Sequence, residues 1–155
     1  MGARTRYRKR ALDVLFESEL QGLPLGGSLP ERLRTNYPPI NAYTVTLVEG
    51  VAEHAARIDA LIERHARDWT LDRMPGVDRN LLRIGLFEIL YADDVPDAVA
   101  VSEAVELARE LSTDDSPSFI GGVLGAIIDA KPGLAAEASA TQLAEDEGER
   151  EGAVD

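Results

Sequence analysis

The sequence predicts an all-α protein with six or seven helices. Three observations support this class. Apolar residues recur at steps of three and four along most of the chain, no segment alternates as a half-buried strand does, and breaks rich in Pro and Gly separate the helical runs. The chain has 155 residues, of which 45% are hydrophobic, so it can form one soluble domain with a buried core.

The first predicted helix runs from about Arg4 to Leu20. Its cationic start leads into an apolar face wide enough to dock on a core, made by Ala11, Leu12, Val14, Leu15, Phe16 and Leu20. The breaker-rich segment 21–27 (QGLPLGG) ends this helix.

A short second helix is predicted between Ser28 and about Asn36. Ser28 is followed three residues later by Glu31, which forms a capping-box pattern, and segment 37–39 (YPP) cannot continue a helix. A long third helix then begins at the predicted N-cap Asn41 and runs to about residue 68. Gly50 lies inside that helix and marks a kink or a close approach of another element.

The stretch from Trp69 to Leu90 organises the predicted fold. After the break at 75–76 (PG), apolar residues cover so much of the helix surface that it should lie at the centre of the core: Val77, Leu81, Leu82, Ile84, Leu86, Ile89 and Leu90. Its polar residues are then expected to share one narrow exposed strip, formed by Asp78, Arg79, Arg83 and Glu88.

Two more helices complete the predicted domain. One starts at about Val101, after the loop 92–96, and the other follows Ser116 and Pro117, a favoured N-cap and N1 pairing. The last helix is expected to stop at 131–133 (KPG). We therefore expect one helical domain over residues 1–133 and an acidic, disordered tail over residues 134–155.

The net charge of −12 argues against nucleic acid only if its distribution is ignored. Residues 137–155 hold seven acidic residues against one arginine, which is half of the excess. At the other end, five cations precede any acidic residue: Arg4, Arg6, Arg8, Lys9 and Arg10. Arg4 and Arg8 lie one turn apart, Tyr7 can stack on a base, and the arginine fork suits phosphate. Composition alone supports nucleic-acid binding and a solvated, solubilising terminus about equally.

Other polar groups do not form a predicted active site. There is no cysteine, and His54 and His65 are about 16 Å apart along one helix, too far to share a metal. The glycine-rich segment 118–125 lacks the Gly-Lys-Ser/Thr of a P-loop, so close packing is favoured about three to one over nucleotide binding. The pairs 93–94 and 114–115 (DD) are typical helix caps. We expect no enzyme, no cofactor and no metal.

No apolar run approaches the roughly 20 residues that span a bilayer, and the N-terminus has no apolar signal segment. A cytoplasmic protein without a membrane partner is therefore expected.

Three segments together resemble the NusB family of bacterial transcription antitermination factors. They are the basic start running into ALDVLF (11–16), WTLDRMPGVDRNLLRIGLFEIL (69–90) and DVPDAVAVSEAVELARELSTDDSPSFIGGVLG (94–125). The similarity covers roughly residues 4–130. It implies two perpendicular three-helix bundles. It also implies a partnership with ribosomal protein NusE, joint binding of the boxA element of nascent ribosomal RNA, and a role in the RNA polymerase antitermination complex that sustains processive transcription.

The resemblance also implies site residues. The family's RNA-contacting positions match Arg4, Arg6, Arg8, Lys9, Arg10, Asp115, Ser116 and Phe119. Its NusE-facing positions match Phe16, Asp78 and Arg79. This chain departs from the family in two places, because Gly121 stands where relatives often carry Asn, and Thr5 and Tyr7 interrupt the arginine motif.

Two alternatives accompany this interpretation. NusB-like domains also occur fused to cytosine methyltransferases that act on ribosomal RNA, but 155 residues leave no room for such a domain. Some relatives form homodimers that cover the arginine motif, and such a homodimer would be a storage or autoinhibited state. A further hypothesis is that the acidic tail competes with RNA for the basic N-terminus.

Overall fold

The computed structural model describes residues 2–67 and 69–152, and every regular element in these ranges is a helix. Seven α-helices and one 3-10 turn follow one another: α1 (Ala3–Leu20), α2 (Leu29–Thr35), α3 (Ala42–Glu53), α4 (Ala55–His65), η1 (Leu71–Arg73), α5 (Gly76–Tyr91), α6 (Asp97–Leu111) and α7 (Ser116–Gly152). The predicted all-α class and the number of helices are confirmed.

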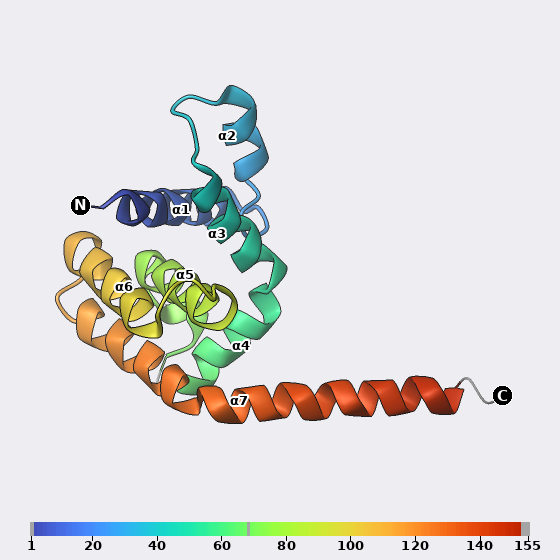
Figure 1. Ribbon diagram of the computed structural model, residues 1–155. Helices are drawn as coiled ribbons and strands as arrows, with labels where there is room; N and C mark the ends of the chain where they lie inside the picture. Colours follow the sequence, from blue (N-terminus) through green and yellow to red (C-terminus); the bar gives the residue numbers. More distant parts are fainter. Residues whose placement is uncertain (1, 68, 153–155) are drawn as a thin grey trace.

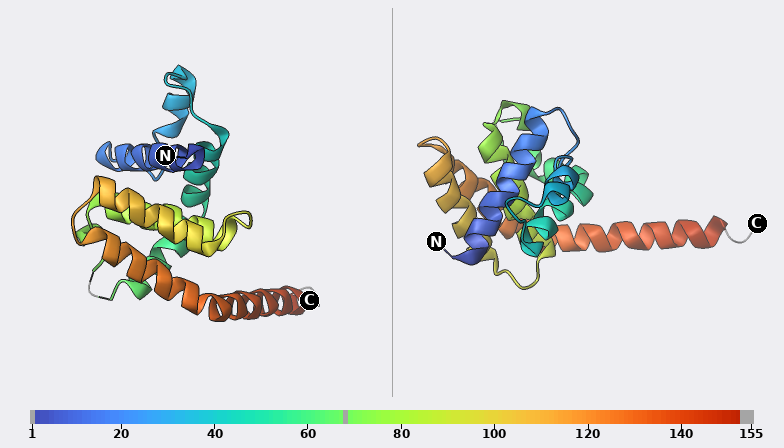
Figure 2. Two further views of the ribbon diagram at one scale, coloured as in Figure 1. Left: turned by 60° about the vertical axis from the view of Figure 1, so that its left-hand side comes forward. Right: turned by 90° about the horizontal axis from the view of Figure 1, so that it is seen from above.

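Helix α5 is the centre of the molecule, as the sequence predicts. It packs against α1, α3, α4, α6 and α7. In Figure 1 and in the left view of Figure 2, α1 and α7 lie on opposite sides of α5, and α6 lies beside it. Leu81, Leu82 and Leu86 are fully buried, so α5 contributes apolar side chains to the core in several directions.

Two glycines allow helices to approach α5 closely. A Cβ atom at Gly50 of α3 would lie 2.2 Å from Cε2 of Phe87, and one at Gly85 of α5 would lie 2.8 Å from Cδ1 of Leu124. The predicted close approach at Gly50 is therefore confirmed. The helices on both sides of α5 depend on positions where any side chain would collide with a ring or an aliphatic chain.

The predicted exposed strip on α5 is wrong. Asp78, Arg83 and Glu88 are only 3%, 6% and 1% exposed. Each is buried because it has a polar partner on another element, which offsets the cost of removing a charge from water. α5 is thus covered on its polar positions as well as on its apolar ones.

The long third helix of the prediction is two helices, α3 and α4, which meet at His54. The start is confirmed, because Asn41 accepts a hydrogen bond from the Tyr43 backbone N–H at 2.8 Å. At the break, the His54 ring stacks on Tyr91 with centroids 3.8 Å apart. The stack draws the chain toward the end of α5, so α4 continues in a new direction.

The predicted capping box at Ser28 is wrong, although α2 begins where it was expected. Ser28 makes no side-chain cap. Its hydroxyl donates to the Val14 carbonyl at 3.1 Å, and its backbone N–H donates to Ser18 Oγ at 3.0 Å. Glu31 instead forms an ion pair with Arg34 on the surface. Ser28 therefore fixes α2 to α1 rather than completing its own helix.

Helices α6 and α7 each differ from the prediction at their starts. α6 begins at Asp97, after Pro96, four residues before Val101. α7 already includes Ser116, so this residue is not the N-cap. The Ser116 hydroxyl accepts a hydrogen bond from the Thr113 N–H at 3.2 Å and donates to Asp78 at 2.8 Å. Ser116 thus ties the turn before α7 to α5.

Helix α7 does not stop at residue 131 but continues through Pro132 to Gly152, so the structure has helix over residues 134–152, where the sequence analysis expected a disordered tail. Leu134 is buried, Lys131 Nζ lies 3.0 Å from Asp97 Oδ1, and Arg64 lies 3.5 Å from Glu137. These contacts hold the helix on both sides of the proline. The following Ala- and Glu-rich residues have high helix propensity.

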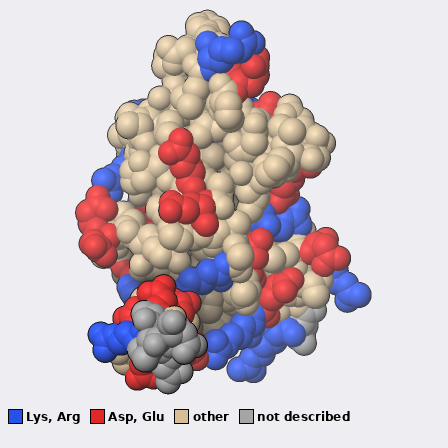
Figure 3. Space-filling view, turned by 90° about the vertical axis from the view of Figure 1, so that its right-hand side faces the viewer, with Lys and Arg blue, Asp and Glu red and all other residues tan. Residues whose placement is uncertain are grey.

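The second half of α7 projects from the body (Figure 1). Seen toward its end, acidic side chains surround the tip, and Lys and Arg side chains gather on the lower part of the same face (Figure 3). By length and composition, α7 is the one helix in the described ranges that could cross a membrane. Its large apolar residues Ile120, Leu124 and Ile127 are fully buried, and a core helix of a soluble protein passes the same test.

Candidate nucleic-acid interface

The five N-terminal cations do not form one exposed cluster, because α1 lays one face against α5. Arg8 is 3% exposed and forms a bidentate ion pair with Glu88, with Nε 2.8 Å from Oε1 and Nη2 2.9 Å from Oε2. Tyr43 donates its hydroxyl to the same carboxylate. Arg4 and Arg8 lie one turn apart, as the sequence predicted, and both guanidinium groups lie over the Tyr43 ring, at 4.4 and 5.9 Å from its centroid.

Burial and charge oppose each other in this cluster. Burial alone would lower the pKa of Arg8, but the hydrogen bonds and charge of Glu88 outweigh it, so the pKa is raised. Burial, followed by the hydrogen bond to Glu88, raises the pKa of Tyr43. Arg8 and Tyr43 therefore keep their protons, and the cluster is a permanent structural link between α1, α3 and α5.

Two further cations make exposed ion pairs. Arg4 Nη2 lies 2.8 Å from Asp94 Oδ2, and Lys9 Nζ lies 2.8 Å from Glu110 Oε1. The hydrogen bond to Asp94 raises the pKa of Arg4, and that to Glu110 raises the pKa of Lys9. Exposed pairs of this kind are weak, so phosphate can compete for either cation.

Arg6 and Arg10 are the cations best placed to bind an anion. They lie one turn apart on the side of α1 that faces away from Arg8 and Leu12, and neither has an ion-pair partner within the residues that the structure describes. Arg6 is exposed and Arg10 is half-buried. The N-terminal motif therefore presents Arg6 and Arg10 to an anion directly. Arg4 and Lys9 can join them by exchanging a weakly bound carboxylate for the anion.

The second group of predicted RNA-binding residues lies at the start of α7, around a cleft of about 380 Å³. Asp115 is exposed at this cleft, Phe119 is half-buried, and Ser116 is buried. The other walls come from the segment before α5, from α5 itself and from the turn before α7, and they are Trp69, Met74, Pro75, Asp78 and Thr113. The start of α7 thus faces the 3-10 turn across a partly apolar hollow.

Asp78 belongs to the base of this cleft rather than to an outer surface. Its carboxylate accepts hydrogen bonds from the hydroxyls of Ser112 and Ser116, and it is 3% exposed. A buried carboxylate with both oxygens occupied is a poor contact for a protein partner. Its position favours a role in fixing the turn that carries Asp115.

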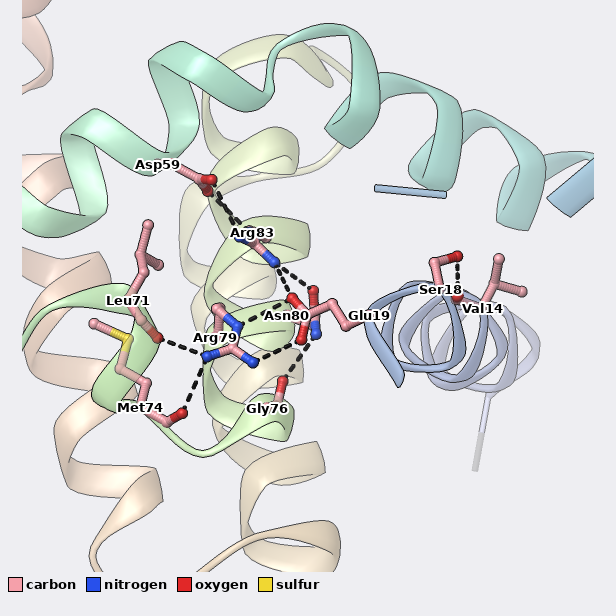
Figure 4. Close-up of polar contacts among 10 residues, drawn as sticks. All are labelled: Val14, Ser18, Glu19, Asp59, Leu71, Met74, Gly76, Arg79, Asn80 and Arg83. Atoms are coloured by element: carbon pink, nitrogen blue, oxygen red, sulfur yellow. Dashed lines mark hydrogen bonds and ion pairs between the residues drawn. The ribbon is translucent and has the colours of Figure 1, made fainter. Parts of the chain in front are cut away.

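Arg79 is likewise engaged inside the molecule (Figure 4). Its Nη2 lies 2.6 Å from Glu19 Oε2, and its Nη1 donates to the carbonyls of Leu71 and Met74 at 2.6 and 3.2 Å. Arg79 therefore fastens the 3-10 turn to α1. Of the three predicted partner-facing residues, Asp78 is buried and the other two are partly accessible, and the Phe16 ring lies against Gly76.

Glu19 joins three helices through the two arginines of α5 (Figure 4). Arg83 donates to Glu19 and, through Nε, to Asp59 of α4 at 2.9 Å. Burial would raise the pKa of Glu19, but the hydrogen bonds from Arg79 and Arg83 outweigh it and the pKa is lowered. Glu19 therefore remains charged at neutral pH.

Two residues near the cleft were not singled out as site residues from the sequence. Trp69 is 49% exposed and lines the cleft, and Arg67 lines a second hollow beside it. A tryptophan next to a helix break was the available signal, because a large aromatic outside a helical stripe has no assigned place in a core. Within the described residues, no three His, Cys, Asp or Glu side chains lie close enough together to hold a metal ion.

Comparison with known proteins identifies the family. The NusB family pattern matches residues 5–129. The transcription antitermination protein NusB of Nocardioides sp. is 56% identical over 135 residues, which is 87% of this chain and all of the relative. That of Kineococcus radiotolerans is 55% identical over 136 residues, 88% of this chain and all of the relative.

Solved structures agree with the sequence relatives. T. maritima NusB superimposes with a TM-score of 0.72 at 29% identity, covering 83% of this chain and 92% of that one. A crystal structure of antitermination factors NusB and NusE in complex with double-stranded RNA gives a TM-score of 0.70 at 28% identity, covering 83% of this chain and 99% of the matched chain. The predicted NusB-like bundle architecture is confirmed, and the chain belongs to the NusB family.

Proposed function

We propose that this protein is a transcription antitermination factor that binds boxA RNA together with ribosomal protein NusE. The observation that carries the proposal is a NusB-type scaffold on which Arg6 and Arg10 have no ion-pair partner among the described residues. The similarity to a NusB chain solved with NusE and RNA supports the choice of partners. Binding to both would let the protein act within the RNA polymerase antitermination complex.

The chemistry of RNA binding is non-catalytic. Arg6 and Arg10 neutralise backbone phosphates and release counterions, and Arg4 and Lys9 can join them by exchanging Asp94 and Glu110 for phosphate. Bases stack on accessible aromatic surface such as that of the half-buried Phe119, at the other end of α5. Two weak contact regions on one rigid scaffold bind a single strand more tightly than either region alone.

The NusE-facing surface centres on Phe16 at the end of α1. Phe16 packs on Gly76, where a Cβ atom would lie 2.5 Å from its ring. The ring therefore lies directly on the backbone of α5, which sets its position at the surface. Asp78 and Arg79 then support this surface from within, through Ser116 and Glu19. The proposed contact with NusE is thus the Phe16 ring, and the buried polar contacts of Asp78 and Arg79 hold the surface around it.

The same proposal includes a cytoplasmic location and no enzymatic activity, since transcription and the relatives' antitermination role both concern nascent RNA. A homodimer that covers α1 is the second candidate state. It would bury Arg6 and Arg10 and compete with RNA, so the two states are exclusive.

RNA binding at two salt concentrations tests the proposal. A boxA-like single strand and a scrambled strand are titrated with the protein, with and without NusE. We expect tighter, sequence-dependent binding when NusE is present, and an affinity that falls as salt rises. Equal and weak binding to both strands with NusE present would exclude the proposed function, and a dimer that RNA never dissociates in gel filtration would favour the structural alternative.

A further inference from the structure

Trp69 separates two hollows that share an aromatic boundary with Phe119. On one side lies the cleft of about 380 Å³ with Thr113, Asp115 and Ser116, and on the other a hollow of about 310 Å³ with His65, Arg67 and Gly122. Both volumes fall in the range of small-ligand sites. The sequence places Trp69 and Phe119 fifty residues apart, and only the fold brings them to one surface.

Neither ring belongs to an aromatic stack within the described residues, although one side of Phe119 packs against the hydrophobic core. Within the described residues, the stacked aromatic rings are those of His54, Phe87 and Tyr91, far along α5 from Trp69. Trp69 is 49% exposed and Phe119 is only half-buried. Both rings therefore have aromatic surface left for a ligand.

The position of Trp69 is fixed although it lies between helices. Its backbone N–H donates to the Ala66 carbonyl at 2.8 Å, which closes the end of α4. On its other side, Arg79 holds the carbonyls of Leu71 and Met74 (Figure 4). A side chain on an anchored backbone loses less freedom when it binds, which favours its use as a contact.

The polar groups around the rings fit a nucleotide better than an apolar protein side chain. Arg67 is exposed and has no ion-pair partner among the described residues, so it can meet a phosphate. Asp115 at the opposite rim offers acceptor oxygens to the amino groups of a base. The hydroxyl of Ser116 is already occupied by Asp78 and Thr113 and does not compete.

We propose that Trp69 is a base-stacking residue, and that Trp69, Phe119 and Arg67 together form a site for one nucleotide of single-stranded RNA. This inference rests on the proposed function, because it extends the RNA path from Phe119 across the end of α4. Stacking accepts any base, so the site adds affinity with little sequence preference. Arg67 adds one phosphate contact at the same place.

Trp69 is the only tryptophan of the chain, so its fluorescence reports on this site alone. The full-length protein with NusE is titrated with a boxA-like single strand while anisotropy of a labelled strand measures binding independently. We expect quenching that saturates at the same RNA concentration as the anisotropy. Quenching by NusE without RNA, and none on RNA addition, would make the cleft a protein contact and overturn the inference.

Two substitutions separate stacking from folding. Trp69→Leu keeps apolar bulk but removes the aromatic face, and Trp69→Phe keeps a ring. We expect at least about fivefold weaker RNA binding for Trp69→Leu, the lower end of the effect of losing one stacked base, and near wild-type binding for Trp69→Phe. Tyr37→Ala is the control, because Tyr37 is 89% exposed and lines neither hollow.

The failure of this inference is distinguishable from that of the proposed function. If Trp69→Leu binds RNA as well as wild type while Arg6→Ala binds more weakly, the function stands and the Trp69 site is excluded. If the wild-type protein with NusE does not prefer the boxA-like strand, the function itself fails. Arg67→Ala adds a second readout, since loss of one phosphate contact should reduce the salt slope by about 0.7.

Discussion

Arg8 and Glu88 form a buried bidentate ion pair between the first and the central helix, with side chains only 4% and 1% exposed. This pair removes one arginine of the predicted RNA-binding motif from the surface. It also explains why α1 stays against α5 at its cationic end. A motif read as five equivalent cations is therefore divided into structural and ligand-binding positions.

Substitution of Arg8 should destabilise the fold rather than weaken a contact with RNA. Arg8→Met leaves Glu88 as an uncompensated buried charge, and we expect a loss of about 3–5 kcal/mol in the free energy of unfolding. Urea denaturation measures this value. Arg6→Met is the matched control, and it should change stability by no more than about 0.5 kcal/mol. A stable Arg8→Met variant with lost RNA affinity would return Arg8 to the interface.

The position of Arg8 could have been read in part from the sequence. Arg8, Leu12 and Leu15 follow one another at helical spacing on the face that docks, so a buried cation was implied by the same periodicity that predicted the helix. Its partner could not be identified, because Glu88 lies eighty residues away and nothing local distinguishes it from the other carboxylates.

The salt dependence of RNA binding should reflect two N-terminal arginines more than five cations. If Arg6 and Arg10 both contact phosphate, replacing both with Ala reduces the slope of log K against log salt by about 1.4 for a single strand. Lys9→Ala should have a smaller effect, because Lys9 gives up Glu110 on binding. Affinities at four salt concentrations measure the slopes. A change for Lys9→Ala as large as the change per residue in the double variant would mean that giving up Glu110 costs Lys9 no binding free energy.

The acid sensitivity of the fold should depend on Glu19. Because Arg79 and Arg83 lower its folded pKa below the value of about 4.3 in an unfolded chain, the stability that it contributes is present above that value and is lost as the pH falls through the folded pKa. Glu19→Gln should therefore be less stable at pH 7 and lose less between pH 5 and pH 3. Glu49→Gln is the control, since Glu49 is exposed and has no ion-pair partner among the described residues. Parallel pH profiles of wild type and Glu19→Gln would contradict this account.

The sequence predicted the helices better than their ends. Periodicity finds a face that docks, and it found α1, α5 and the buried side of α7. The end of α7 was wrong because Pro132 and Gly133 are strong local breakers, whereas burial of Leu134 and the pair of Lys131 with Asp97 act only in the folded chain. The polar partners of Asp78 and Arg79 were missed for the same reason. Whether a charged side chain on a helix is exposed depends on partners from other elements.

Removal of the charge of Asp115 should tighten RNA binding. Its carboxylate is exposed at the cleft and would repel a phosphate, and a like charge about 8 Å away in water costs about 0.5 kcal/mol. Asp115→Asn keeps an acceptor oxygen, so we expect affinity about two- to threefold higher at low salt. Asp129→Asn, exposed elsewhere on α7, controls for net charge. Weaker binding of Asp115→Asn than of this control would show that the RNA requires the negative charge of Asp115 and not only an acceptor oxygen.

The acidic end of α7 should not compete with RNA for the N-terminal arginines of the same molecule. The two lie at opposite ends of the molecule (Figure 1), and a helix of 37 residues extends about 55 Å, so it cannot fold back without breaking. At 0.1 M salt, exposed charges more than about 10 Å apart are largely screened from each other. We expect removal of residues 140–155, which hold six acidic residues and one arginine, to leave RNA affinity at that salt within about twofold of wild type.

A longer truncation separates the charge of the tail from its packing. Removal of residues 131–155 also takes away Leu134, which is buried, and the ion pair of Lys131 with Asp97. It should cost about 1.5–3 kcal/mol in stability from the leucine alone. In the shorter truncation, the residues whose exposure the structure describes are all exposed, so it should cost little. Tighter RNA binding after the shorter truncation would revive self-competition, and because the helix cannot reach its own N-terminus, the competing tail would have to come from a second copy of the chain.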